Sequence, residues 1–453
     1  MNSNFNFWQV FFRLLHMYAG VFIAPFIFIA ALSGLFYAAT PQIEQFIYKD
    51  VLYIEQSHLK INPLSQQIEK AKQLLSPTAQ ITEVRPSPAV NQTTRIIFSD
   101  SELELNNEAI FIDPYTLEVK GQLAVYGTSG LLPFRTRLDH LHRDLLLGSW
   151  GRFYSELAAS WLAILIFTGF FQWYKRHNTV GKNKTNQNNY INQNNYIKKH
   201  STIGLVLFPL LLFVAVTGLT WSEYAGENIR IFRQALSWQT PVLATSIKAE
   251  STSKMIMHHE DHSMVHNDAP VQVTSSDFDI ALDLARKYGI DAAQIQIKPP
   301  LDKDQAWSIS EIQLHWPTQA DRIAIDISNH RVIDKLYFDD YPLIAKLTRW
   351  GVDAHIGILF GWINQLILII YSLALCVMIL YAYLAWYKKT NFKQTVIQFP
   401  NLFLSVWTNS NMLQRVTLGT ILIIFGVLLP LFGFSLIVGL VAIFIGSINE
   451  RKA

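Results

Sequence analysis

Four histidines stand at the ends of long apolar runs: His16, His200, His142 and His355. An ionisable side chain in such a place costs free energy unless it has a partner, so intramembrane histidines are functional by default. Gly20 and Gly204 each follow a histidine by four residues, one helical turn along the same face. A missing side chain there leaves room for a flat macrocycle. Two facing imidazoles with glycine alongside therefore suit a haem iron held from both axial sides.

The four histidines belong to two constant registers. In the first, an offset of 184 positions carries His16, Gly20, Pro25, Ser33 and Gly34 onto His200, Gly204, Pro209, Thr217 and Gly218. In the second, an offset of 213 positions carries His142, Gly148 and Trp173-Tyr174-Lys175 onto His355, Gly361 and Trp386-Tyr387-Lys388. We interpret the chain as a tandem duplication of helix, outer domain and helix. The difference between 213 and 184 indicates an insertion of 29 residues in the second outer segment.

The duplication predicts two histidine pairs at opposite faces of a membrane: an inner pair, His16 and His200, and an outer pair, His142 and His355. Cations near the pairs could neutralise haem propionates, and these are Arg13, Lys198 and Lys199 for the inner pair and Arg143 and Arg349 for the outer pair. His140 faces a different way from His142 on a helix, so we assign the outer ligand to His142.

Other uses of these histidines are open at this point. Each could be an interfacial residue that is simply hydrogen-bonded. A structural zinc ion is a weaker fit, because it needs four nearby ligands and the two pairs lie too far apart to supply them together. A transporter could use the histidines as proton relays, although its inverted repeats would differ from this parallel duplication.

The composition indicates that these residues belong to a membrane protein. Half of the 453 residues are apolar, only 16% are charged, and the mean hydropathy is +0.19. Apolar spans long enough to cross a bilayer lie near 11–39, 153–174, 201–222 and 357–387. A last apolar stretch, 416–448, is interrupted by Pro430 and Gly433. It forms either one kinked helix or a hairpin, and Arg451 and Lys452 favour the hairpin.

Charge gives the orientation. Of the 34 acidic residues, 31 lie in 41–141 and 222–353, whereas 175–199 and 387–415 carry lysine and arginine but no acid. Short basic segments stay in the cytoplasm, so the two acidic stretches face outward. Each acidic stretch reads as a helix followed by a meander of strands. The expected helices are 63–75 and 275–289, and the expected strands are 79–86, 93–99, 107–113, 293–298, 307–314 and 322–327.

The second outer stretch also contains a possible metal site. Seven thioether and imidazole donors lie within 255–266: Met255, Met257, His258, His259, His262, Met264 and His266. This donor set favours copper, although imidazoles also suit nickel or zinc, and a variable loop with no bound metal is the competing interpretation. The only cysteine, Cys376, lies in an apolar run, so disulfides and cysteine-ligated clusters are excluded.

These motifs resemble those of the PepSY-associated transmembrane family, which includes iron-regulated membrane proteins and inner-membrane ferric-siderophore reductases. The resemblance rests on the two His-x3-Gly motifs, LHRDLLLG (141–148), TGLTWS (217–222) and HIGILFG (355–361), and AIFIDPYTLEVKG (109–121) resembles a PepSY domain. It implies two b-type haems with His16, His200, His142 and His355 as axial ligands, and electron transfer to ferric-siderophore complexes in the periplasm. One departure is ILYAYLAW (379–386), which lacks the glycine usual before the aromatic end of the fourth helix.

We therefore expect a bacterial inner-membrane dihaem protein: a helical bundle with two periplasmic α+β PepSY-like domains and a C-terminal hairpin. No flavin or nicotinamide motif is visible, so a quinol or a cytoplasmic reductase must supply electrons. Membrane lipid and a ferric chelate are the other expected partners, and nucleic acid is not one. The alternative is a non-redox sensor or a copper-handling protein. The expected order is helix 1–40, domain 41–141, helix 142–175, linker 176–199, helix 200–222, domain 223–353, helix 354–388, cytoplasmic segment 389–415 and hairpin 416–448.

Overall fold

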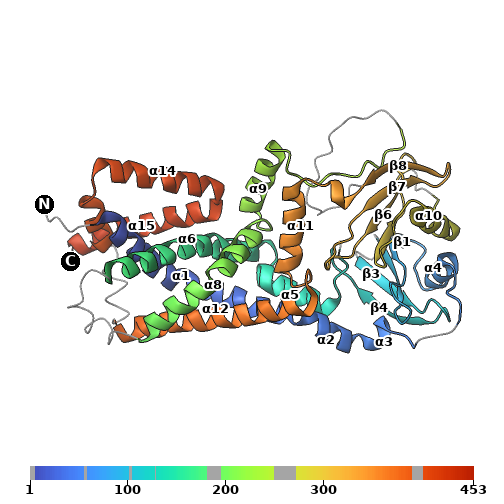
Figure 1. Ribbon diagram of the computed structural model, residues 1–453, viewed down its shortest axis with the longest axis horizontal. Helices are drawn as coiled ribbons and strands as arrows, with labels where there is room; N and C mark the ends of the chain where they lie inside the picture. The colour runs from blue at the N-terminus through green and yellow to red at the C-terminus, as the bar shows by residue number, and fades with distance from the viewer. Residues whose placement is uncertain are drawn as a thin grey trace.

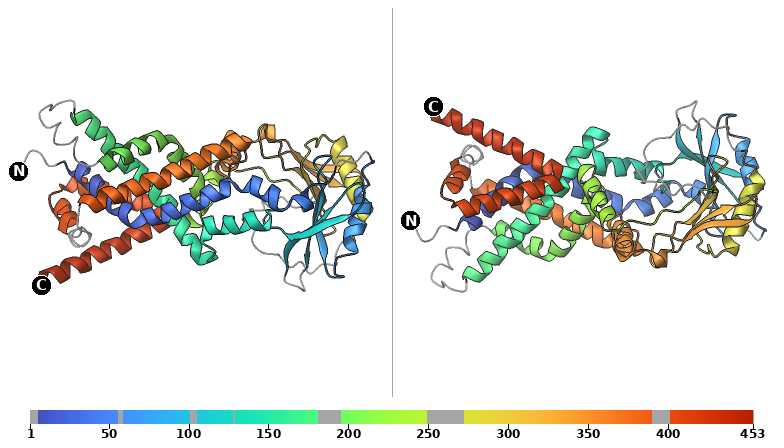
Figure 2. Two further views of the ribbon diagram at one scale, coloured as in Figure 1. Left: turned by 90° about the horizontal axis from the view of Figure 1, so that it is seen from below. Right: turned by 90° about the horizontal axis from the view of Figure 1, so that it is seen from above.

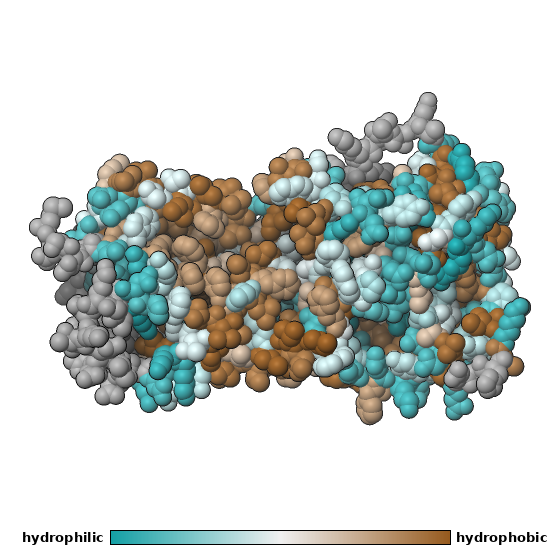
Figure 3. Space-filling model, in the orientation of Figure 1, coloured by the Kyte–Doolittle hydropathy of each residue, from teal (hydrophilic) through white to brown (hydrophobic). Residues whose placement is uncertain are grey.

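The structure is a computed structural model that describes residues 6–55, 59–100, 105–127, 129–180, 195–248, 272–389 and 401–452. It has a helical part at one end and an antiparallel sheet at the other (Figure 1). Apolar side chains cover the helical part, whereas polar ones prevail over the sheet (Figure 3). Four helices are long and apolar enough to cross a membrane, as expected. They are α1 (Phe7–Ala38), α6 (Ser149–Val180), α8 (Asn195–Leu219) and α12 (Gly361–Lys389).

These four helices form a bundle in which each packs against two neighbours. The contacts join α1 to α6 and α12, and α8 to α6 and α12, so that α1 and α8 occupy opposite corners. The views from below and above show the bundle from two further sides (Figure 2). Whatever lies between α1 and α8 is enclosed by all four helices. This arrangement creates the interior in which the inner pair lies.

Short helices connect the bundle to the sheet. Between α1 and the sheet lie α2 (Thr40–Ile47) and α3 (Lys49–Leu52), and α9 (Tyr224–Ala235) follows α8. The chain returns through α5 (Pro133–Asp144) and α11 (Leu343–His355). The expected helices 142–175 and 354–388 therefore begin too early. His142 and His355 lie at the ends of separate helices, and Gly148 and Gly361 adopt left-handed φ angles of 61° and 59° in the turns before the long helices. Glycine tolerates this conformation, which accounts for its presence at both equivalent positions of the second register.

The sequence analysis predicted two separate outer domains, but the two acidic stretches fold together. Their strands make one eight-stranded sheet in the order β4-β3-β2-β1-β5-β6-β7-β8, joined where Val84 of β1 pairs with Ile297 of β5. Pairing two edge strands satisfies backbone groups that would otherwise be exposed. The strands are β1 (Gln80–Arg85), β2 (Thr94–Asp100), β3 (Leu105–Ile112), β4 (Val119–Ala124), β5 (Ile295–Lys298), β6 (Trp307–Glu311), β7 (Arg322–Asp326) and β8 (Arg331–Leu336).

Helices α4 (Leu64–Lys72) and α10 (Ser275–Lys287) cover the face of the sheet that points away from the bundle (Figure 1). Asp279 of α10 accepts hydrogen bonds from the backbone N–H groups of Leu64 and Ser65, at 2.6 and 3.2 Å. One stretch thus caps the helix of the other. A single core, with Ile68 and Phe278 buried in it, lies between the helices and the sheet. The other face of the sheet is left facing the bundle, where η2 (Phe338–Asp340) precedes α11.

The C-terminal stretch forms two helices, α14 (Met412–Leu428) and α15 (Pro430–Lys452). A Cβ atom added to Gly433 would lie 2.8 Å from the Cα atom of Gly426, so the two backbones touch across the turn. The hairpin is therefore the correct alternative. It packs on α6, where the Trp161 indole N–H donates a 2.9 Å hydrogen bond to Ser435 Oγ.

Candidate functional site

The inner pair lies inside the bundle, between the two helices at opposite corners. His16 of α1 and His200 of α8 come from opposite corners, and their ring centres are 6.2 Å apart with an interplanar angle of 68°. The pairing that the register predicts is thus present in space. Helices α1 and α8 both begin at the end of the bundle farther from the sheet (Figure 1), and His16 and His200 lie within the first turns of these helices.

Every ring of the four is held through its Nδ1 atom. The partners are Thr168 Oγ1 at 3.1 Å for His16, the Met378 carbonyl at 3.0 Å for His200, Ser33 Oγ at 3.0 Å for His142 and Thr217 Oγ1 at 2.7 Å for His355. Each of the three hydroxyls donates its own proton to a carbonyl of its helix, so it accepts from the imidazole. A carbonyl can only accept. All four rings therefore carry hydrogen on Nδ1 and keep the Nε2 lone pair for another partner.

Three glycines make room for the rings. A Cβ atom added to Gly169 would lie 3.0 Å from His16 Cε1, and one added to Gly34 would lie 3.3 Å from His142 Cε1. Gly218 stands in the same relation to His355, at 3.8 Å. These contacts explain why Gly34 and Gly218 share a register with Ser33 and Thr217. In each pair the hydroxyl is hydrogen-bonded to one outer histidine, and the glycine leaves space for its ring.

The two glycines expected to provide clearance behave differently from each other. An added Cβ atom at Gly20 would meet no atom within 4 Å, so space for a flat group is present there. At Gly204 it would lie 3.3 Å from Met378 Sδ, so the thioether already occupies this space. The inner pair is therefore asymmetric, with open space on the α1 side.

A cavity of about 190 Å³ contains the outer pair. His142 and His355 both line it, and its remaining walls include small residues of three long helices: Ala30, Ala31, Gly34, Ala158, Ala215 and Gly218. Burial lowers the pKa of His142, and burial together with the neighbouring His142 lowers the pKa of His355 to about 4. Both rings are then neutral at pH 7, the form in which an imidazole binds a metal.

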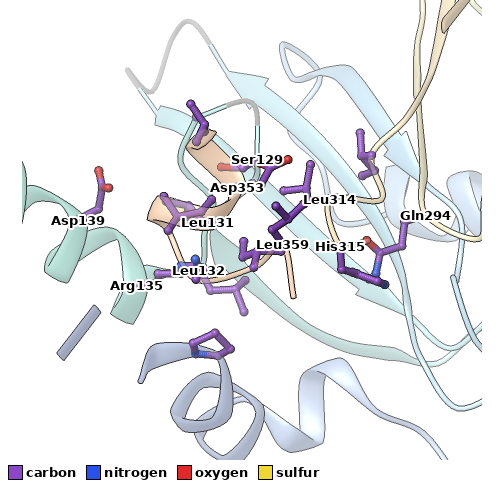
Figure 4. A pocket seen from close by; sticks show the side chains of 18 of the residues that line it. Ser129, Leu131, Leu132, Arg135, Asp139, Gln294, Leu314, His315, Asp353 and Leu359 are labelled. Atoms are coloured by element: carbon purple, nitrogen blue, oxygen red, sulfur yellow. The ribbon is translucent and has the colours of Figure 1, made fainter. Parts of the chain in front are cut away.

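A second and much larger cavity, of about 1560 Å³, separates the sheet from the bundle. Its lining includes Arg135 and Asp139 of α5, Gln294 and His315 from the sheet side, and Leu359 (Figure 4). Tyr37, Arg143 and Trp221 line both cavities, so the larger one adjoins the outer pair. A molecule in the large cavity would therefore lie next to the outer histidines.

The cations expected near the pairs are mostly engaged or exposed. Arg349 Nε lies 3.0 Å from Asp353 Oδ2, and Arg143 donates a 2.9 Å hydrogen bond to the Tyr126 hydroxyl and lies 3.6 Å from Asp144. Arg13, Lys198 and Lys199 are exposed at the far end of the bundle. His140 Nδ1 lies 3.0 Å from Asp144 Oδ2, its ring packs against Tyr126 at an interplanar angle of 58°, and it does not line the outer cavity.

The donor sets can be tested against the predicted haems. Within the described residues, no group of three or more histidine, cysteine, aspartate or glutamate side chains could hold a metal ion. Two imidazoles alone can hold only a metal that brings further ligands, as a haem iron does. Two nitrogens each at about 2.0 Å from one metal place the ring centres roughly 6 Å apart, and the inner pair has that separation. By this separation, the inner pair fits the group. Residues 255–266, the proposed copper site, lie outside the described residues.

Sequence reasoning missed the groups that orient the rings. Ser33 and Thr217 were visible as repeat positions, and their hydroxyls were the available signal. Thr168 and Gly169 carried no such signal, because the second register places Tyr381 and Ala382 opposite them. Ala382 stands where the first half has Gly169, so the space that the His16 ring uses has no equivalent for His200. His200 is hydrogen-bonded to the Met378 carbonyl instead.

Replacing Ser33 with alanine is expected to weaken cofactor binding at the outer pair by roughly tenfold to a hundredfold, because His142 loses the acceptor that fixes its tautomer and orientation. The inner pair should be unaffected. Haem retention during purification and the optical spectrum measure the effect. Ser160→Ala is the matched control, since its buried Oγ has no hydrogen-bond partner in the described part of the chain. Equal retention in both variants would contradict the assignment.

Comparison with known proteins supports the family suggested by the motifs. The family model described as the PepSY-associated TM region matches residues 13–389, which include all four histidines and both halves of the sheet. No curated protein matches the chain. Because the match covers most of the chain, the protein is a member of the PepSY-associated transmembrane family.

Proposed function

We propose that this membrane protein is a dihaem b-type electron-transfer protein of the bacterial inner membrane. In this proposal it reduces Fe(III) chelates of the siderophore type on the periplasmic side, with electrons from a quinol or a cytoplasmic reductase. The observation that carries the proposal is the set of four histidines, each with Nδ1 engaged and the Nε2 lone pair kept. Haem would supply one-electron chemistry, and it would be held by His16 with His200 and by His142 with His355.

The spacing of the pairs supports transfer across a membrane. His16 and Ser33, which holds His142, are separated by 17 residues on α1, and His200 and Thr217 by the same number on α8. At 1.5 Å per residue the two pairs lie about 25 Å apart along the bundle. This is most of the hydrocarbon thickness of about 30 Å. Imidazoles near both ends of the bundle would divide the crossing into two shorter steps.

The chain's own residues have distinct roles in this proposal. The four imidazoles hold and orient the cofactors, and the hydroxyls and the Met378 carbonyl keep the rings in one tautomer. The large cavity would receive the chelate beside the outer pair, between the sheet and the bundle. Addition of one electron to Fe(III) gives Fe(II), which the chelate holds less tightly.

Vesicles that contain the purified protein test the proposal. A reduced quinol is supplied in the membrane, a ferric chelate is added on the side of the sheet, and a colour-forming Fe(II) trap reports reduction. Fe(II) should appear at a rate that depends on the protein and should fall to the protein-free rate in His355→Ala. Fe(II) formation at equal rates with and without the outer histidine would contradict the proposed route. Tight chelate binding without any reduction would favour the non-redox, metal-handling alternative.

A further inference from the structure

Helix α9 has one polar face and one exposed apolar face. Ile231 and Phe232 are 52% and 59% exposed in the described part of the chain, and Leu236, directly after the helix, is 42% exposed. On the polar face, Arg230 pairs with Glu227 at 2.5 Å. A helix with two such faces is stable when the apolar one is buried, and an exposed apolar patch of this kind marks a protein or membrane contact.

Two anchors fix the direction of α9. Glu156 of α6, which is 1% exposed, accepts 2.9 Å hydrogen bonds from the first two backbone N–H groups of α9. These donors have no partner inside the helix itself. Asn228 Nδ2 donates to the carbonyls of Val427 and Leu428 at the end of α14, at 2.9 and 3.2 Å. Held at both places, α9 runs across the direction of the long helices (Figures 1 and 2).

Several chain ends mark the level at which α9 lies. Helix α8 ends directly before α9, and α6 and α12 begin at the same, sheet-facing end of the bundle (Figure 1). Trp150 at the start of α6 and Trp362 at the start of α12 are 79% and 68% exposed. Exposed tryptophans at helix ends are typical of the boundary between a membrane and water. The boundary of the bilayer therefore passes close to α9.

The apolar face of α9 is continuous with the lipid-facing surface of the bundle. Val427 and Leu428, whose carbonyls bind Asn228, are themselves 68% and 52% exposed. Apolar surface extends over this end of the helical part (Figure 3). The polar side of α9 has different surroundings, because Glu223 and Glu227 line the large cavity. Lipid on one side and water on the other match the two faces.

We propose that α9 is an interfacial helix whose apolar face, Ile231, Phe232 and Leu236, inserts into the phospholipid leaflet on the side of the sheet. Such a helix lies in the plane of the membrane with its apolar side chains about 5–10 Å below the headgroup level. Its polar face remains in water as a wall of the large cavity. The proposal does not depend on haem or on electron transfer.

Spin labels on the full-length protein test the depth of the helix. Cys376→Ala removes the only native thiol, and Phe232→Cys then provides one labelling position. Vesicles of phosphatidylethanolamine and phosphatidylglycerol receive the protein. Oxygen, which partitions into lipid, should relax the label at position 232 strongly, and a water-soluble nickel chelate should relax it weakly. Gln234→Cys, exposed on the polar face of the same helix, is the matched control and should show the reverse order.

A second label separates lipid from protein as the occupant. A fluorescent bimane at position 232 should be quenched by phospholipids brominated near the top of the acyl chain, and less by those brominated at its end. Nickel access at position 232 equal to that at 234 would place the helix in water and overturn the proposal. Access to neither reagent, or dipolar broadening between two labels, would show a protein contact and also overturn it. Ile231→Cys, on the same face, repeats both measurements and should give the same result.

Discussion

Replacing His200 with alanine is expected to remove the inner haem and spare the outer one, which lowers the haem content from about two to about one per chain. The reason is geometric. His200 contributes one of two rings whose centres are 6.2 Å apart, and alanine leaves His16 as the single donor. The outer histidines are hydrogen-bonded to Ser33 and Thr217, about 25 Å from the inner pair along the bundle. The outer pair should therefore keep its haem.

The mirror variant sharpens this prediction. His355→Ala should remove the outer haem and leave the inner one, and the two spectra should add up to that of the wild type. His177→Ala is the control, because His177 is exposed near the end of α6, where it stacks on Trp173. Loss of neither haem in His200→Ala, or loss of both without unfolding, would contradict the pairing.

Replacing Gly169 with valine is expected to lower inner-haem affinity by roughly tenfold or more, since overpacking of this kind costs about 1–3 kcal/mol. Even a single Cβ atom at Gly169 would lie 3.0 Å from His16 Cε1, so the ring must move away from Thr168. The outer haem should stay. Haem stoichiometry and the low-spin spectrum of the inner site report the loss.

Gly419→Val is the matched control for this variant. Gly419 also lies within an apolar helix, but an added Cβ atom there would meet nothing within 4 Å. Both haems should therefore be retained. Retention of the inner haem in Gly169→Val would mean that the His16 ring does not need its present position.

Sequence patterns predicted the parts of the fold that depend on local order. Long apolar runs identified the four spanning helices, and alternation identified most strands, because burial on one face of an element repeats with its period. The terminal strands β4 and β8 were missed, since VKGQLA and RVIDKL are largely half-buried or exposed and alternate weakly. The joined sheet was also missed, because the pairing of Val84 with Ile297 spans more than two hundred residues and no local pattern records it.

The candidate site was predictable as far as the registers reached. Two offsets selected the histidines and placed hydroxyls at Ser33 and Thr217, and the structure brings each hydroxyl to one outer ring. Contacts outside the registers could not be inferred. Met378 holds His200 through a backbone carbonyl, which any residue type would provide.

Haem quantification on the purified, full-length protein from haem-replete cells tests the central claim most directly. The protein should be red, with a b-type, low-spin spectrum and about two haems per chain, because each histidine pair offers two Nε2 lone pairs. A folded protein that is colourless under these conditions would contradict the assignment of His16, His200, His142 and His355 as haem ligands.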